Sequence, residues 1–193
     1  MFNTLNALNS LIVSRKGFAA EDLIQQLSAF LRHSLKNQDD QWVPLKEELQ
    51  ALEAYLAIQQ VRFGERLVLE IPEAKVFTNL KAAQSFQHAI ASHGCRIALE
   101  QFGSGLNSFQ LLQHLDPAFL KIDRAFIADL AKNAENQKKV REIAEAGRAA
   151  GKLTVAEFVQ DAGSMTVLFG SGVDYVEGHF LAPAGPEMTY EFG

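Results

Sequence analysis

Charged and polar side chains follow two neighbouring apolar runs in the second half of the chain. Glu100 and Gln101 come directly after the first run, and Lys121 and Asp123 lie two residues apart at the end of the second. A spacing of two places both side chains on the same face of a strand. Folds built from parallel strands place their binding and catalytic groups at the carboxyl ends of those strands. We therefore expect a charged site where these runs end.

The segment between the two runs predicts how they are connected. Residues 102–105 form a loop, and residues 107–115 have the apolar spacing of a helix, which Asp116-Pro117 ends. Strand, helix and strand in this order form a βαβ unit. Gly103 and Gly105 indicate only a tight loop. A lone Gly-x-Gly is weak evidence of phosphate binding.

The same alternation of strands and helices extends over residues 66–177. Strands are predicted at 66–71, 95–100, 118–122, 152–157 and 173–177. Helices are predicted at 80–92, 107–115, 124–132, 135–150 and 161–169. Helical crossovers between successive strands indicate a parallel sheet with right-handed connections. The predicted fold class is therefore α/β, with a five-stranded parallel sheet. It would form part of a (β/α) barrel, because a closed barrel has about eight strands.

Residues 1–64 have a different pattern, with apolar residues at helical spacing and no predicted strand. We expect a helical hairpin here, with Gly64-Glu65 as the junction between a helical segment, 1–64, and an α/β segment, 65–193. The apolar stripes of the hairpin consist of Leu23, Leu27, Phe30, Leu31, Leu49, Leu52 and Leu56. Because parallel sheets are normally covered on both faces, we expect these stripes to cover the open sheet, within one chain or across a homodimer.

Composition narrows the class of protein. The chain has 193 residues, 48% hydrophobic and 21% charged, which is typical of a globular protein. We expect no membrane span and no signal peptide, and a single cysteine, Cys95, fits a reducing, cytoplasmic location. A net charge of −5 argues against nucleic acid as a partner. The histidines show no metal-ligand spacing.

Four motifs of the α/β segment resemble, in order, those of EAL domains, the cyclic-di-GMP phosphodiesterase family. They are residues 69–73 (Leu-Glu-Ile-Pro-Glu), residues 99–108 with 120–123 (Leu-Lys-Ile-Asp), residues 155–160 (Val-Ala-Glu-Phe-Val-Gln) and residues 173–178 (Val-Asp-Tyr-Val-Glu-Gly). The resemblance covers residues 66–193, which correspond to about the C-terminal half of such a domain. It implies a partial EAL-type barrel.

EAL enzymes hydrolyse a phosphodiester with metal ions held by carboxylates. The resemblance places Lys121 beside the attacking water, and the metal-ligand positions are matched by Glu70, Glu100, Asp123 and Glu157. Gln101 stands where the family has the second of two paired aspartates, and the tripeptide that names the family falls outside this chain. We therefore expect no catalytic residues, no metal, no cofactor and no enzyme activity.

Degenerate EAL domains bind cyclic-di-GMP without cleaving it, and the chain resembles their FimX-like branch. In that branch an aromatic near Phe158 can stack on a guanine, and Asp123 or Glu157 accepts hydrogen bonds from base nitrogens. Stacking on an aromatic side chain is worth roughly 1–3 kcal/mol per base. The candidate ligand-binding residues are Glu70, Glu100, Gln101, Lys121, Asp123, Glu157 and Phe158.

The helical segment resembles the dimerisation and phosphoacceptor region of LytS-type sensor histidine kinases. The matching stretches are residues 2–6, 27–32, 43–49 and 59–64. The phosphoacceptor histidine of that family lies just ahead of the Phe-Asn pair, where this chain has Met1. The resemblance therefore implies a homodimer through the N-terminal helices without kinase activity.

Taken together, these patterns favour a non-catalytic signalling or scaffold module related to cyclic-di-GMP receptors. The alternative is an engineered or recombined chimera without a ligand, in which the helices complete the core of a half-barrel. A nucleotide bound to the purified protein would separate the two.

Overall fold

The computed structural model describes residues 2–36 and 45–181 of the chain. Contacts divide the chain into two compact units, which are described separately below. One comprises Met1–Val68 with His88–Arg96, and the other comprises Leu69–Gln87 with Ile97–Gly193. Among the helices in the described ranges, none is long and apolar enough to cross a bilayer.

The first unit consists mainly of helices α1 (Phe2–Val13), α2 (Gly17–Lys36) and α3 (Leu45–Phe63). A short 3-10 turn, Gly64–Arg66, follows α3. The predicted apolar stripes provide part of the packing, since Leu23 and Leu56 are buried and the rings of Phe30 and Tyr55 lie 5.6 Å apart. Of the stretches that resemble sensor kinases, Val43 and Pro44 lie outside the described residues.

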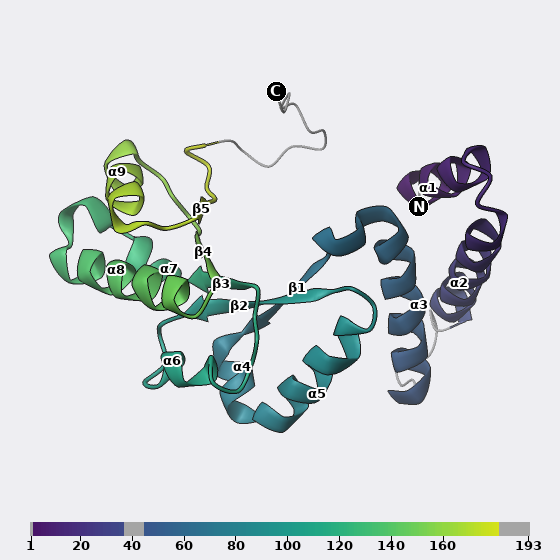
Figure 1. The fold of residues 1–193 in the computed structure, drawn as a ribbon, viewed down its shortest axis with the longest axis horizontal. Coiled ribbons are helices and arrows are strands. Elements are labelled where there is room, and N and C mark those ends of the chain that lie inside the picture. Colours follow the sequence, from purple (N-terminus) through teal and green to yellow (C-terminus); the bar gives the residue numbers. More distant parts are fainter. Residues whose placement is uncertain (1, 37–44, 182–193) are drawn as a thin grey trace. The chain divides into compact units, whose positions relative to one another are not determined.

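The second unit is built on a five-stranded parallel sheet (Figure 1). Its strands are β1 (Val68–Pro72), β2 (Arg96–Phe102), β3 (Phe119–Ile122), β4 (Leu153–Ala156) and β5 (Tyr175–Val176). Spatial order follows chain order, β1-β2-β3-β4-β5, so each crossover joins neighbouring strands. Within the described residues the sheet is open, with β1 and β5 as its edges. The predicted fold class is therefore confirmed.

Helices α7 (Arg124–Ile127), α8 (Ala134–Ala149) and α9 (Ala162–Ser171) of this unit begin at recognisable capping residues. Asp123, Asn133 and Asp161 each accept hydrogen bonds from backbone amides of the turn that follows. The helices that precede them are α4 (Glu73–Thr78), α5 (Leu80–Ala91) and α6 (Ser108–Leu111). A second 3-10 turn, Leu130–Lys132, lies between α7 and α8.

Three helices differ from the sequence-based expectation. The helix predicted at 124–132 is divided into α7 and the 3-10 turn Leu130–Lys132, because Asp129 has a left-handed backbone with φ of 53°. The helix predicted at 107–115 is shortened to α6, and turns occupy the residues between it and β3. Helix α4 was not predicted; it begins directly after Pro72, whose fixed φ suits the position before a first helical turn. Helices α4 and α6 lie at the carboxyl ends of β1 and β2, next to the site described below.

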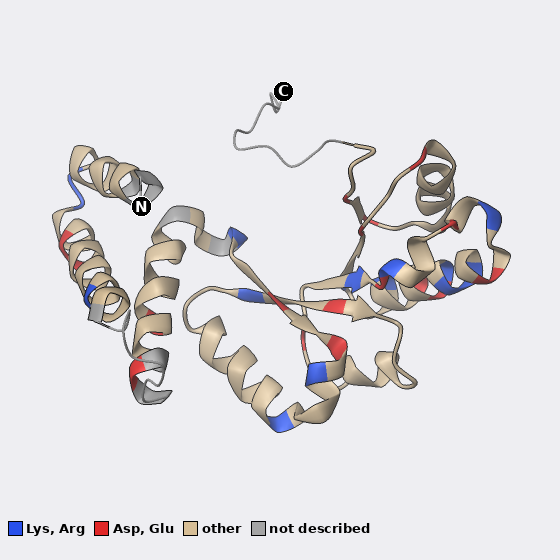
Figure 2. Cartoon of the chain, turned by 180° about the vertical axis from the view of Figure 1, so that it is seen from behind, with Lys and Arg blue, Asp and Glu red and all other residues tan. Residues whose placement is uncertain are grey.

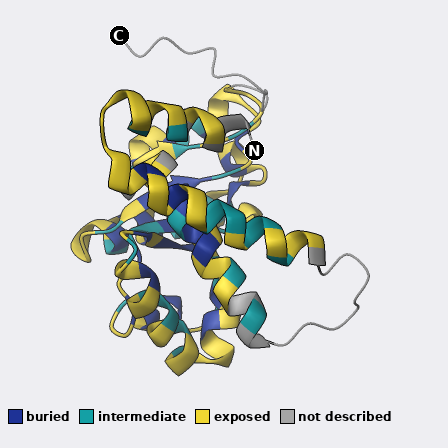
Figure 3. Ribbon diagram, turned by 90° about the vertical axis from the view of Figure 1, so that its right-hand side faces the viewer, coloured by how far each residue is buried: buried dark blue, intermediate teal, exposed yellow. Residues whose placement is uncertain are grey.

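The two faces of the sheet have different roles. A Cβ atom at Gly147 would lie 2.8 Å from the side chain of Thr154 and 3.4 Å from that of Leu120, so α8 packs closely on that face. Leu120 and Thr154 are fully buried, as are most strand residues that share their face (Figure 3). Because side chains alternate along a strand, Lys121 points to the opposite face. On that face Phe119 contacts Tyr175 edge-to-face, with 6.2 Å between the ring centroids.

Candidate functional site

Lys121 lies at the centre of a charged cluster at the carboxyl edge of the sheet. Its ammonium nitrogen lies 2.6 Å from Oε1 of Glu70 and 2.6 Å from Oε1 of Glu157. Oε2 of Glu177 lies 4.0 Å away. The carboxylates come from β1 and from the segments directly after β4 and β5, whereas Lys121 comes from β3. The parallel sheet thus brings together side chains from four strand ends, and red and blue segments lie together on the sheet in Figure 2.

Burial makes the charge on Lys121 depend on these carboxylates. Only 8% of its side chain is exposed, whereas 44% of the Glu70 side chain is exposed. Burial alone would lower the pKa of Lys121, but hydrogen bonds and charges from Glu157 and Glu70 raise this pKa above its usual value. Lys121 is therefore a fixed cation at any physiological pH.

The acidic members of the cluster differ in their proton affinity. Burial would raise the pKa of Glu70, yet hydrogen bonds with Lys121 and Glu100 and the charge of Lys121 lower it. The hydrogen bond with Glu70 raises the pKa of Glu100, and burial and repulsion from Glu70 act in the same direction. Burial also raises the pKa of Glu177, with repulsion from Glu157 and Glu70 opposing the attraction of Lys121. The pKa values of Glu100 and Glu177 are therefore raised, whereas that of Glu70 is lowered.

Two predicted site residues serve local roles in the structure. Asp123 accepts a hydrogen bond of 2.8 Å from the backbone amide of Ala125 and so caps α7. Gln101 is exposed, has a left-handed backbone with φ of 55°, and its carbonyl accepts a hydrogen bond from Ser104. Within the described residues no hydrogen bond or ion pair joins either side chain to Lys121. As ligand contacts, both residues stay predictions.

Phe158 directly follows Glu157 in the chain and presents an exposed aromatic ring. It is 52% exposed and its backbone φ is 60°, in the left-handed region that bulky residues rarely adopt. The guanidinium carbon of Arg124 lies 5.2 Å from the centroid of its ring. The structure thus adds to the predicted aromatic an arginine that sequence reasoning missed.

Glu73 is a second residue that sequence reasoning missed. This buried carboxylate accepts hydrogen bonds from the amide of Gly103, at 2.8 Å, and from the hydroxyl of Ser108, at 2.6 Å. A Cβ atom at Gly105 would lie within van der Waals distance of the same carboxylate, so glycine is required there. Glu73 therefore fixes the loop after β2. Glu73 is the last residue of the motif at 69–73, which was the one signal in the sequence that could have singled it out.

The resemblance to EAL enzymes implies metal ions, and the arrangement of side chains tests whether they would fit. Among the described residues, no three His, Cys, Asp or Glu side chains gather as metal ligands. The ammonium of Lys121 occupies the position between Glu70 and Glu157, and Asp123 caps a helix. These side chains, as arranged, do not form a metal centre, and no chemical step through one follows from them.

Sequence comparisons identify relatives of the chain. Cyclic di-GMP phosphodiesterase PdeF of Escherichia coli is 31% identical over 121 residues, which are 63% of this chain and 16% of PdeF. Cyclic di-GMP phosphodiesterase PdeB of Shewanella oneidensis is 31% identical over 139 residues, which are 70% of this chain and 16% of PdeB. The chain thus spans less than a fifth of the length of either relative.

Solved structures give closer matches. The EAL domain of Xanthomonas citri FimX in complex with c-diGMP has a TM-score of 0.68 and 39% identity, over 96% of this chain and 78% of that chain. The FimX EAL domain of Pseudomonas aeruginosa bound to c-di-GMP has a TM-score of 0.65 and 33% identity, over 72% of this chain and 57% of that chain. The predicted FimX-like relationship is thus supported by fold and by sequence.

One sequence-based expectation is corrected by these findings. We expected no enzyme activity, because Gln101 replaces a charged ligand and because strands of the barrel fall outside the chain. The relatives PdeF and PdeB are named phosphodiesterases, which contradicts that expectation. The expectation gave too much weight to the neutral side chain of Gln101, since Glu70 and Glu157 still converge on Lys121 in the structure.

The extent of the family match also bears on the N-terminal helices. The family model described as EAL domain covers residues 24–184, which include α3 and most of α2. The resemblance of residues 1–64 to sensor kinases, and a chimeric origin, stay predictions. With more than half of its residues matched by the family model, the chain belongs to the EAL domain family.

Proposed function

We propose that the edge formed by the Lys121 cluster and Phe158 binds cyclic-di-GMP. The observation that carries this proposal is the convergence of Glu70 and Glu157 on Lys121, at 2.6 Å each, with the exposed aromatic residue Phe158 directly after Glu157 in the chain. A guanine needs these two kinds of group: a flat apolar surface for its ring and acceptors for its donor nitrogens. The two FimX EAL domains, which are solved in complex with c-di-GMP, support the same assignment.

The charge balance of the edge favours contact with a base over contact with a phosphate. Glu70 and Glu157 lie 2.6 Å and Glu177 lies 4.0 Å from a single ammonium group, and Glu100 is hydrogen-bonded to Glu70. Lys121 already shares its protons with two of these carboxylates, so it has little capacity for a phosphate. Carboxylate oxygens that accept from a guanine edge, with Phe158 stacked on the ring, would use the groups as they are arranged. Stacking would contribute roughly 1–3 kcal/mol per base.

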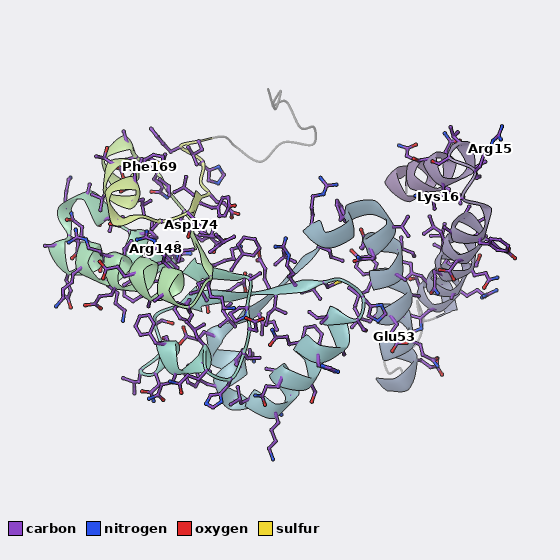
Figure 4. All side chains as sticks on the ribbon, in the orientation of Figure 1. Arg15, Lys16, Glu53, Arg148, Phe169 and Asp174 are labelled. Carbon is purple, nitrogen blue, oxygen red and sulfur yellow. The ribbon has the colours of Figure 1, made fainter. Side chains whose placement is uncertain are left out.

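Calorimetric titration of the whole chain with cyclic-di-GMP tests this proposal. Binding should weaken by roughly five- to a hundredfold in Phe158→Ala, the range that loss of one stacked base allows. Phe169→Ala is the matched control, because Phe169 is also an exposed phenylalanine (67%) but lies on α9, as Figure 4 shows. If the unmodified chain does not bind at millimolar ligand, the proposal is wrong and the ligand-free chimera is favoured.

Phosphodiester hydrolysis is the second candidate function, favoured by the relatives named cyclic di-GMP phosphodiesterases. It is tested by incubating the chain with cyclic-di-GMP and Mg²⁺ or Mn²⁺ and separating the products by chromatography. Linear dinucleotide above the level given by Lys121→Ala would establish turnover at this cluster. Equal amounts of product from the unmodified chain and from Lys121→Ala would show that a contaminating enzyme causes the hydrolysis.

A further inference from the structure

We infer that Arg124 is a positioning residue for the ligand: its guanidinium backs one face of the Phe158 ring and leaves the opposite face for a guanine base. This inference rests on the proposed binding of cyclic-di-GMP. It concerns a residue outside the predicted site, and it assigns to α7 a part in base recognition.

Neighbouring strand ends bring the two side chains together. Ile122 of β3 pairs in register with Ala156 of β4. Arg124 lies two residues beyond the first of these and Phe158 two residues beyond the second, so both leave the sheet at the same edge. The guanidinium carbon lies 5.2 Å from the centroid of the ring, within the distance of a cation–π contact.

The backbone around Phe158 is fixed, whereas its side chain is not enclosed. The following residue, Val159, is fully buried, and its amide donates a hydrogen bond of 3.0 Å to the carbonyl of Glu177. A Cβ atom at Gly178 would lie 2.2 Å from the carbonyl oxygen of Val159, so these two backbones pack closely. The ring itself is half exposed, and across the described ranges Arg124 is the one charged or aromatic group recorded against it.

The distance between the Arg124 guanidinium and the Phe158 ring determines on which face of the ring a base can stack. A base inserted between ring and guanidinium would need roughly twice the 3.5–4.0 Å contact distance of stacked atoms, and 5.2 Å is too little. A guanine must therefore use the opposite face of Phe158. Arg124 makes no ion pair of 4.0 Å or less with a carboxylate of the described residues, so it is available to hold the ring in place.

A double-mutant cycle on the whole chain separates this role from a direct contact with phosphate. We expect Arg124→Ala to weaken cyclic-di-GMP binding by roughly two- to fivefold, the range for an exposed cation–π contact. In the Phe158→Ala background, the same change should have no further effect. Arg124→Lys should restore part of the affinity, because the cation is kept. Arg141→Ala, which removes an exposed arginine from α8, is the matched control.

A second readout does not require ligand. In the free protein, Arg124→Ala should shift the ring proton resonances of Phe158, whereas Arg141→Ala should leave them unchanged. A loss of affinity that persists in the Phe158→Ala background would overturn the inference in favour of a phosphate contact. If Phe158→Ala weakens binding and Arg124→Ala does not, the inference about Arg124 is wrong, whereas the proposed function stands. Absence of binding by the unmodified chain would overturn the proposed function, and the inference with it.

Discussion

The ammonium nitrogen of Lys121 lies 2.6 Å from Oε1 of Glu157, and this contact joins the end of β3 to the segment after β4. The contact has two consequences. It holds a buried cation that would otherwise be costly to desolvate. It also fixes the direction of the loop that carries Phe158, the neighbour of Glu157. The charged cluster is therefore part of the framework of the fold as well as part of the candidate site.

Removing the cation should destabilise the protein. In Lys121→Met the carboxylates of Glu70 and Glu157 lose their partner and repel one another. We expect the free energy of unfolding to fall by about 1–3 kcal/mol, less than for a fully buried pair because Glu70 is partly exposed. Urea denaturation measures this change. Lys138→Met is the control, since Lys138 is 79% exposed and its ion pair with Glu142 should contribute little. Equal losses in the two variants would mean that the Lys121 contacts contribute no special stability.

The loop after β2 should depend on Glu73. Glu73→Ala removes the acceptor of the Gly103 amide and of the Ser108 hydroxyl, and should cost about 2–4 kcal/mol of unfolding free energy. Glu73→Gln should cost clearly less, because an amide can accept from Gly103 and donate to Ser108. Amide hydrogen exchange at Gly103 reports on the same contact and should be faster in Glu73→Ala. Unchanged exchange there would show that the loop is held by other groups.

Ligand binding should strengthen as pH falls. The pKa values of Glu100 and Glu177 are raised, so both carboxylates take up protons at a pH above their ordinary value of 4.5. Protonation removes negative charge from an edge that must accept an anionic dinucleotide, and affinity measured from pH 8 down to pH 5 should rise. The other charged groups that face these carboxylates are Glu70, Glu157 and Lys121. Glu100→Gln should reduce the dependence of the affinity on pH. If the affinity depends on pH as strongly in Glu100→Gln as in the unmodified chain, Glu100 does not cause the effect.

The raised pKa of Glu100 also determines how the stability of the fold changes with pH. The pKa of Glu100 is raised in the folded state, so its hydrogen bond with Glu70 contributes stability that is present at low pH. That contribution is lost as pH rises through the raised value. Glu70, whose pKa is lowered, contributes in the opposite direction, and its share is lost as pH falls. The Glu100→Gln variant should therefore lack the fall in stability that Glu100 causes as pH rises above 4.5.

The sequence predicted the sheet well, because its strands are short apolar runs that end in charged residues. The runs before Glu100 and around Lys121 became β2 and β3, and their charged ends meet as expected. The helix after Gly105 was predicted too long, since turn formation before Pro117 outweighs its apolar spacing. That these charged residues meet could be predicted from the sequence, because the carboxyl ends of parallel strands lie at one edge of the sheet.

Other parts of the site could not be predicted from the sequence. Glu73 is an acidic residue among several, and only the tertiary structure shows that its carboxylate is buried against Gly103. The contact of Arg124 with Phe158 joins loops that lie far apart in sequence and depends on the register of β3 and β4. Asp123 matched a ligand position by motif, yet its side chain caps α7. Such choices between local and long-range partners are decided by packing.

The N-terminal helices are expected to cover the open face of the sheet, within one chain or in a homodimer. Residues on the face of Lys121, such as Phe119, would otherwise each cost roughly 1.5–3 kcal/mol in water. Deleting residues 1–64 should therefore give insoluble or dye-binding protein, and sedimentation equilibrium of the whole chain measures whether it dimerises. A fragment of residues 65–193 that stays soluble, monomeric and cooperatively folded would show that the sheet needs no such cover.

Backbone amide shifts recorded during a titration with cyclic-di-GMP test the central claim most directly, because they report both binding and its place. The account predicts saturable shifts that gather at three strand ends: residues 100–104, 121–125 and 157–159. Phe158→Ala should reduce the affinity without moving the set of residues that respond. Shifts that gather instead in residues 2–36 and 45–66, or no shifts at millimolar ligand, would contradict the claim that the Lys121 cluster and Phe158 form a binding site for cyclic-di-GMP.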